Sequence, residues 1–221
     1  MAAKTVVAFD LYGTLLSTES IAKQLEKHCD NAKAQSISAL WRRNASKLDG
    51  QIIDDQKGRF EDFSVITRNS ILHALADNNE QLSDDNIEHL MQAYDGLYTF
   101  SDVNPALALI AADPTIQVVI FSNGTKTMVS NSVLWSKDLL PHASVFQDIV
   151  TVDKVQQFKP SKASYEHLES RQGMQAIWVD RVGAGWKNAA APDLQPTGIV
   201  QSGADYKRKS SPSALSQGFQ H

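Results

Sequence analysis

The chain has 221 residues, of which 42% are hydrophobic and 21% are charged, and its formal net charge is −4. This length and composition are those of a globular protein that can bury a sizeable core. A net negative charge provides no basic field for binding nucleic acid. No apolar stretch of the sequence is long enough to span a bilayer.

The first residues and the single cysteine bear on the cellular compartment. Residues 1–4 lead straight into an apolar run and lack the charged and apolar regions of a signal peptide. Cys29 is the only cysteine, so no disulfide can form within the chain, which is typical of a reducing compartment. We therefore expect a cytoplasmic protein that binds neither membranes nor nucleic acid.

The first predicted element is a strand that ends beside a carboxylate. Residues 5–9 form an apolar, β-branched run, which predicts a fully buried parallel strand. Asp10 follows it at the strand end, where open α/β sheets bind their ligands. Asp10 is thus placed as a nucleophile or a metal ligand, and Gly13 would let the backbone approach a substrate closely. An aspartate that caps a helix or a turn would leave the same pattern.

Residues 18–98 carry helical periodicity and no strand pattern. Apolar residues spaced at i, i+3, i+4 and i+7 follow Ser83, a candidate helix N-cap. They are Ile87, Leu90, Met91 and Tyr94, and a second stripe consists of Ile71, Leu72 and Leu75. We interpret both stripes as packing faces and the whole segment as an all-helical insertion.

An α/β pattern resumes after this insertion, so the predicted fold class is a doubly wound parallel α/β sheet with an inserted helical domain. The predicted strands span residues 117–121, 148–152, 176–180 and 197–200, and the predicted helices span residues 105–112 and 162–171. The predicted organisation is an α/β core of residues 1–17 and 99–200, a helical domain of residues 18–98 and a loose, polar tail of residues 201–221.

Three predicted strand ends together carry what a carboxylate nucleophile needs. A covalent acyl intermediate requires an ionised carboxylate, a cation that keeps it ionised and donors for an oxyanion. Asp10 can be the carboxylate, Lys159 the cation, and Ser122 with the backbone amides after it the donors. Taken singly, a lysine before a proline is typical of a solvated loop, and Ser122–Gly124 is typical of a turn or a helix cap.

These residues resemble the haloacid dehalogenase superfamily, and within it the type II (S)-2-haloacid dehalogenases, from residue 5 to residue 200. The most specific matches are residues 9–15, 121–124, 158–161 and 177–181. The resemblance implies a Rossmann-like core with a helical cap that closes over the active site. It implies hydrolysis of short 2-halo carboxylic acids by water, without a cofactor, and it implies that the chain can form a homodimer.

Position 12 decides the branch of the superfamily. Its phosphatases carry a second aspartate two residues after the nucleophile, where it acts as general acid and accompanies a magnesium site. Tyr12 stands at that position, and a phenol is neither a carboxylic acid nor a good magnesium ligand. The resemblance therefore implies a dehalogenase that needs no metal. A phosphatase-like hydrolase and an inactive relative that only binds a ligand or a partner are the alternatives.

The resemblance also assigns roles to single residues. Asp10 would displace halide from C2 with inversion, and water would then cleave the resulting ester. Arg42 matches the arginine that receives the halide, although a surface helix arginine would look the same. The other assigned positions are Thr14, Ser122 and Asn123, which would orient carboxylates, and Leu11, Tyr12 and Tyr165, which would contact the substrate or lie near Lys159.

One strand-plus-helix unit of the family, its fourth motif, is missing after Lys159. In the family that strand neighbours the Asp10 strand and carries an acid that positions the lysine and activates water. We expect residues 176–180 to fill the vacant place, because residues 160–175 are long enough for a parallel crossover. Asp180 would then partly replace the missing acid, and hydrolysis of the ester would be impaired.

Overall fold

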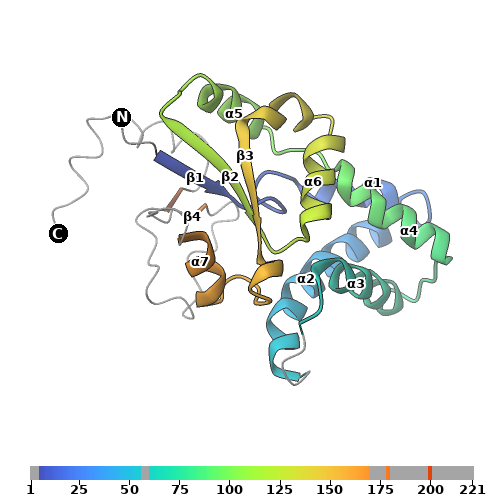
Figure 1. Ribbon diagram of the computed structural model, residues 1–221. Coiled ribbons are helices and arrows are strands. Elements are labelled where there is room, and N and C mark those ends of the chain that lie inside the picture. The colour runs from blue at the N-terminus through green and yellow to red at the C-terminus, as the bar shows by residue number, and fades with distance from the viewer. Residues whose placement is uncertain (1–4, 56–59, 170–177, 180–198, 201–221) are drawn as a thin grey trace.

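The computed structural model describes residues 5–55, 60–169, 178–179 and 199–200. Its main sheet has three parallel strands in the order β1-β2-β3 (Figure 1). The strands are β1 (Thr5–Phe9), β2 (Ile116–Ser122) and β3 (Phe146–Thr151). The predicted strands at residues 5–9, 117–121 and 148–152 are thus confirmed, with ends that differ by no more than two residues.

Helices cover both faces of this sheet, which confirms the predicted fold class. The helices of the core are α5 (Val103–Ala111), α6 (Lys126–Trp135) and α7 (Lys162–Glu169), and the short 3-10 helices are η3 (Leu140–Val145) and η4 (Val152–Lys154). Ile120 of β2 packs in one hydrophobic cluster with Val129 of α6, whereas its neighbours Val119 and Phe121 pack in a second cluster with Leu168 of α7. Because successive strand residues point to opposite faces, α6 and α7 lie on opposite sides of the sheet.

β1 is half-buried, so the prediction of a fully buried strand is wrong. It pairs with β2 along one edge, and within the described ranges no strand pairs with its other edge. β2 has a neighbour on both sides and is buried from Val118 to Ser122. Among the described strands β1 is thus an edge strand, which accounts for its exposure.

Two short strands form a separate parallel sheet near the C-terminus, β4 (Trp178–Val179) and β5 (Ile199–Val200). The prediction that residues 176–180 fill the place beside β1 is wrong for the two residues described, because their backbone pairs with β5 instead. Asp180, the remaining residues of that predicted strand and the predicted tail at residues 201–221 lie outside the described residues.

The region between β1 and α5, here called the helical region (residues 18–98), is helical as predicted in its described residues, 18–55 and 60–98. Its elements are η1 (Thr18–Ile21), α1 (Ala22–Leu25), α2 (Asn31–Asp55), α3 (Phe63–Asp77), α4 (Asp84–Ala93) and η2 (Tyr94–Gly96). The side chain of Ser83 accepts a hydrogen bond from the backbone N–H of Asn86 at 3.3 Å, which confirms the predicted N-cap. Leu72 is exposed and does not belong to the buried stripe of Ile71 and Leu75, because it points about 100° away from Ile71 around the helix.

Trp41 joins α2, the longest described helix of this region, to α3 and η2. α2 and α3 lie side by side (Figure 1). The Trp41 side chain is fully buried, and its Nε1–H donates to the carbonyl of Thr67 on α3 at 2.8 Å. Its ring packs on Tyr94 of η2 with the centroids 4.8 Å apart. Among the described helices, none has both the length and the apolar character needed to cross a bilayer.

We expect Trp41→Phe to lower the free energy of unfolding by about 1–3 kcal/mol, because it removes the hydrogen bond to Thr67 and leaves a small void. Urea denaturation measures the change. Trp135→Phe is the matched control: Trp135 is 59% exposed, so its change should stay within about 0.5 kcal/mol. Equal effects of the two substitutions would contradict the anchoring role of Trp41.

Candidate active site

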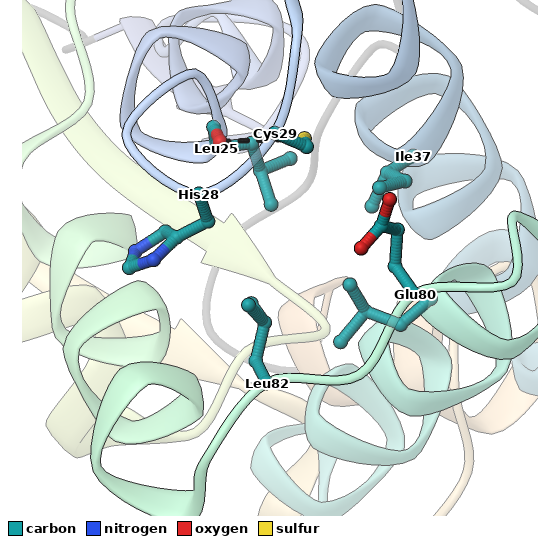
Figure 2. A pocket seen from close by; sticks show the side chains of 7 residues that line it. Leu25, His28, Cys29, Ile37, Glu80 and Leu82 are labelled. Atoms are coloured by element: carbon teal, nitrogen blue, oxygen red, sulfur yellow. Dashed lines mark hydrogen bonds between the residues drawn. The ribbon is translucent and has the colours of Figure 1, made fainter.

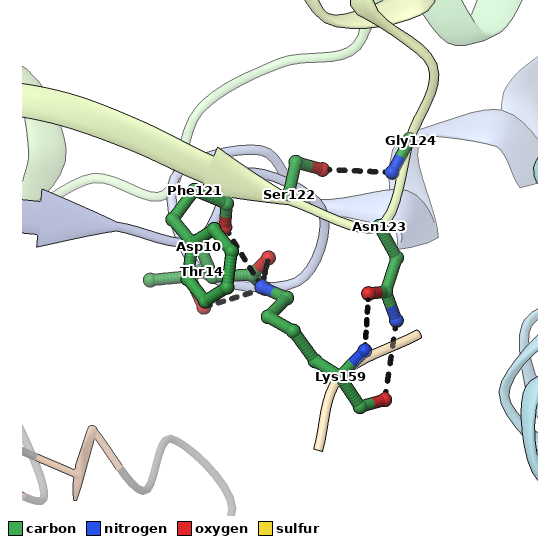
Figure 3. Close-up of polar contacts among 7 residues, drawn as sticks. All are labelled: Asp10, Thr14, Phe121, Ser122, Asn123, Gly124 and Lys159. Carbon is green, nitrogen blue, oxygen red and sulfur yellow. Dashed lines mark hydrogen bonds and ion pairs between the residues drawn. The ribbon is translucent and has the colours of Figure 1, made fainter. Parts of the chain in front are cut away.

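Asp10 and Lys159 form an ion pair at the carboxyl edge of the main sheet (Figure 3). The Lys159 ammonium donates to Asp10 Oδ1 at 2.6 Å, across 149 positions of sequence, and to the carbonyl of Phe121 at 2.7 Å. The lysine side chain is 14% exposed, whereas the Asp10 side chain is 39% exposed. The cation is therefore held inside, and the carboxylate stays accessible from outside.

The turn after β1 fixes the position of Asp10. Leu11 is fully buried, and its carbonyl accepts the backbone N–H of Leu15 at 2.9 Å. Gly13 has a φ of +84°, a left-handed conformation that glycine adopts without the steric strain other residues meet. The chain therefore turns sharply at the strand end, and the carboxylate remains at the edge of the sheet.

The two oxygens of Asp10 have different partners. Oδ1 accepts the short, charge-assisted bond from Lys159, and Oδ2 accepts a longer one, at 3.3 Å, from the hydroxyl of Thr14. Oδ2 is thus the more weakly held oxygen. A carboxylate held in this way is oriented and still has an oxygen that can form a new bond.

Asn123 holds the backbone of Lys159. Its Oδ1 accepts the Lys159 N–H at 2.7 Å, and its Nδ2 donates to the Lys159 carbonyl at 3.4 Å (Figure 3). This pair of contacts joins the end of β2 to the loop before α7. The sequence indicates Asn123 as a site residue but gives no sign of this contact, which spans 36 positions.

Ser122 shapes the turn between β2 and α6. Its hydroxyl is buried and accepts the backbone N–H of Gly124 at 3.1 Å. Thr125 then caps α6 by accepting the N–H of Met128 at 3.2 Å. These contacts are those of a turn and a helix cap, as the sequence pattern of residues 122–124 indicates. The same turn also places Asn123 against Lys159.

Tyr12 connects the core to the helical region. Its hydroxyl lies 3.0 Å from Ser132 Oγ on α6, and its ring stacks on Phe63 of α3 and packs on Tyr94 of η2. Burial raises the pKa of Tyr12 well above its usual value, so the phenol stays neutral. Ser132 and Phe63 are contacts that the sequence analysis did not identify, because nothing in their local patterns distinguishes them from other helix residues.

One aromatic ring, that of Phe121, packs against the Lys159 ammonium. The ammonium lies 4.8 Å from the centroid of the Phe121 ring, close enough for a cation–π contact. Tyr165 of α7 packs edge-on against the same ring at 5.6 Å. Burial, and to a smaller extent the charge of Asp10, raise the pKa of Tyr165 above its usual value. Tyr165 therefore presents a neutral phenol within electrostatic range of Asp10.

Arg42 lies on α2 and forms an ion pair with Glu19 of η1 at 3.4 Å, with both side chains exposed. Burial raises the pKa of Tyr94, and the positive charge of Arg42 opposes this rise. Arg42 is therefore within electrostatic range of Tyr94, whose ring packs on Tyr12. The ion pair described for Arg42 is with Glu19.

A separate cleft lies in the helical region and shares no residue with the Asp10 site (Figure 2). Its lining residues are Leu25, His28, Cys29, Ile37, Leu75, Glu80 and Leu82. The thiol of Cys29 donates to the carbonyl of Leu25 at 3.4 Å. Burial, followed by the charge of Glu80, raises the pKa of Cys29, so this thiol is a poor nucleophile.

Comparison with known proteins agrees with this fold. Residues 4–180 match the model of the haloacid dehalogenase-like hydrolases. An (S)-2-haloacid dehalogenase of Pseudomonas fluorescens is 30% identical over 170 residues, which cover 75% of this chain and 69% of that protein. One of Pseudomonas putida is 27% identical, covering 76% of this chain and 70% of that protein.

A solved structure shows the same fold. The L-2-haloacid dehalogenase of Xanthobacter autotrophicus with chloropropionic acid covalently bound superimposes with a TM-score of 0.74, at 23% identity, covering 98% of this chain and 82% of that chain. A parallel sheet with helices on both faces and a carboxylate at its carboxyl edge place the chain in the class of Rossmann-like α/β proteins, here with an inserted helical region. The chain belongs to the haloacid dehalogenase-like hydrolase family.

Asp95 is a buried carboxyl group beside the Tyr12 contacts. It lies in η2, and Asn131, the neighbour of Ser132 on α6, donates to its Oδ2 at 3.2 Å. Burial raises the pKa of Asp95 by more than this hydrogen bond lowers it. Between the unfolded and folded pKa values the folded state binds more protons, so stability falls as the pH rises through this window.

We therefore expect Asp95→Asn to raise the free energy of unfolding at pH 7, and the gain to shrink as the pH is lowered towards the pKa of an unfolded aspartate. Urea denaturation at a series of pH values measures this. Asp113→Asn is a control of opposite sign: hydrogen bonds from Thr115 lower the pKa of Asp113. That substitution should lower stability at pH 7 and have less effect in acid. The same sign for both variants would refute the assignment.

Proposed function

We propose that this chain is a hydrolytic dehalogenase of short 2-haloalkanoic acids in which Asp10 is the nucleophile. The observation that carries the proposal is the Asp10 carboxylate, partly exposed and held by the Lys159 ammonium at 2.6 Å. Tyr12 supports the dehalogenase branch, because a buried neutral phenol takes the place of the second acid of the phosphatases. The (S)-2-haloacid dehalogenases among the relatives support the substrate class.

In the first step, Oδ2 of Asp10 attacks C2 of the substrate. A new bond forms between Oδ2 and C2, the bond from carbon to halogen breaks, and the halide leaves with its electron pair. Attack from the side opposite the halogen inverts C2. Lys159 holds Oδ1, so that the weakly bonded Oδ2 faces the reacting carbon.

In the second step, water attacks the carboxyl carbon of the Asp10 ester. The 2-hydroxy acid leaves with the oxygen that attacked C2, the carboxylate forms again with an oxygen from water, and one proton is released. Negative charge develops on Oδ1 during this attack, and the Lys159 ammonium lies where it stabilises that charge. The same lysine therefore serves both steps.

The remaining site residues would bind and orient the substrate. Arg42 would receive the departing halide, because a guanidinium is a strong partner for an anion. The other proposed contacts are Thr14, Ser122 and Asn123 for carboxylate orientation and Leu11, Tyr12 and Tyr165 as the lining of the substrate site. We propose that the helical region is the cap, since Phe63 and Tyr94 pack on Tyr12 beside the nucleophile.

Three expectations stay predictions. Asp180 would partly replace the acid of the missing fourth motif, and Asp180→Asn with unchanged ester hydrolysis would contradict that role. The missing motif predicts slow ester hydrolysis. A homodimer in the cytoplasm is the expected state, which gel filtration and cell fractionation would test.

We expect Asp10→Asn to reduce chloride release from (S)-2-chloropropionate by about a thousandfold or more, because an amide oxygen is a much weaker nucleophile than a carboxylate. Asp77→Asn, at an exposed aspartate of α3, is the control and should retain wild-type release. Mass spectrometry of the wild type during turnover should show a propionate ester on the peptide that contains Asp10.

The outcomes of this experiment separate the alternatives. An ester that accumulates with little chloride release beyond one equivalent would mean that its hydrolysis is impaired. Neither ester nor chloride from the wild type would contradict the proposal and favour a relative that only binds. Release of phosphate from a phosphomonoester, dependent on magnesium and without chloride release, would favour the phosphatase-like hydrolase.

Arg42 and Arg43 provide a matched pair for the halide site. We expect Arg42→Gln to reduce kcat for chloride release roughly 100-fold, because it removes the charge that stabilises the departing anion. Arg43→Gln, at the exposed neighbouring position on the same helix, should change kcat less than about twofold. Similar losses in the two variants would mean that Arg42 acts only through the general charge of α2.

A further inference from the structure

Gly124 sits where no side chain fits. It is buried in the turn between β2 and α6, and its φ is not positive, so backbone strain does not require glycine there. A Cβ atom at Gly124 would lie 2.9 Å from Cε2 of Tyr12 and 3.3 Å from both Ser122 Oγ and Val129 Cγ2. Space alone therefore selects glycine at this position.

The Tyr12 ring cannot turn away easily from such a Cβ. Phe63 stacks on it with an angle of 18° between the ring planes, Tyr94 packs on it with its centroid 5.9 Å away, and its hydroxyl is held by Ser132 at 3.0 Å. The ring is thus fixed by two aromatic contacts and one hydrogen bond. Any side chain at position 124 must displace either the ring or the turn.

The turn that contains Gly124 also positions the lysine of the active site. Asn123 precedes Gly124 and holds both backbone polar groups of Lys159, and the N–H of Gly124 donates to Ser122. Lys159 in turn contacts Asp10 at 2.6 Å. A shift of the turn by a few tenths of an ångström therefore reaches the ion pair through Asn123.

We propose that Gly124 is a positioning residue for the dehalogenation, a role that rests on the proposed function. Its missing side chain admits the Tyr12 ring against the turn, so that Tyr12 is fixed beside Asp10 while Asn123 keeps Lys159 in place. The Tyr12 ring and the turn at Gly124 thus hold each other in place, an arrangement here called the interlock. The positions of Tyr12 and of Lys159 are therefore set together. Active sites need such support, because small displacements of a catalytic group cost much of the rate.

A double-mutant cycle tests this interlock. Gly124→Ala is made in the wild type and in Tyr12→Leu, which lacks the ring atom that the new Cβ would meet. Gly96→Ala is the control, because no atom lies within 4 Å of a Cβ there and the φ of Gly96 is not positive. Thermal unfolding and chloride release from (S)-2-chloropropionate are measured for every variant.

In the wild type we expect Gly124→Ala to lower Tm by roughly 4–8 °C and kcat by roughly 10- to 100-fold. In Tyr12→Leu, the decreases in Tm and in kcat caused by Gly124→Ala should each be at least several-fold smaller than in the wild type. Gly96→Ala should leave both unchanged. The fall should appear mainly in kcat rather than in KM, because the displaced group is the lysine that acts in the chemical steps.

Equal effects of Gly124→Ala in the two backgrounds would overturn the interlock. A lower Tm with unchanged kcat would reduce Gly124 to a packing role and overturn its positioning role. A wild type that releases no halide would overturn the proposed function instead, and the Tm values of the cycle would still decide whether Gly124 and Tyr12 interlock.

Discussion

The ion pair of Asp10 and Lys159 is the interaction on which the site depends. Its two partners lie at the ends of distant segments, and they meet because β1 and β2 are adjacent and the loop before α7 returns to the same edge of the sheet. Attraction between charges is stronger in such a half-buried place than in water, and either charge left alone there would be costly. The ammonium is further satisfied by the Phe121 carbonyl and the face of its ring. The cation is buried and the carboxylate is partly exposed. A reagent from solvent can therefore approach Asp10 more easily than Lys159.

The sequence predicts most strands and helices of this fold well, but it predicts less well which of them lie side by side. Apolar runs and turn residues locate β1, β2 and β3, and Ser83 locates the start of α4, because these signals are local. The exposure of β1 could not be predicted from its own residues, since an apolar run does not reveal which strands pair with it. The pairing of β4 with β5 was missed for the same reason. Helix α6 was also missed: its Thr, Ser and Asn residues are typical of turns, and its apolar positions become clear only where Val129 and Val133 pack under the sheet.

The candidate site was likewise predicted where the signal is local and missed where it depends on contacts between distant segments. The residue types of Asp10, Ser122 and Lys159 indicate the chemistry, and their positions after predicted strands indicate a common edge. The contact of Asn123 with the Lys159 backbone joins positions far apart in the sequence, so no local pattern could reveal it. The contact between Tyr12 and Ser132 spans 120 positions and depends on a helix that the sequence did not predict. Residue types thus predict what a site can do, and the packing of distant segments determines how it is held.

Tyr12 connects the choice of reaction to the placement of the helical region. The substitution of a phenol for the second acid of the phosphatases removes a proton donor and a metal ligand beside Asp10. It also adds a ring that Phe63 and Tyr94 of the helical region contact directly. An aspartate at position 12 would lose these contacts, because its side chain is too short and too polar to fill the same space. The residue that separates the two branches by chemistry therefore also contributes to the packing of the helical region beside Asp10, so an aspartate at this position would change the structure as well as the chemistry.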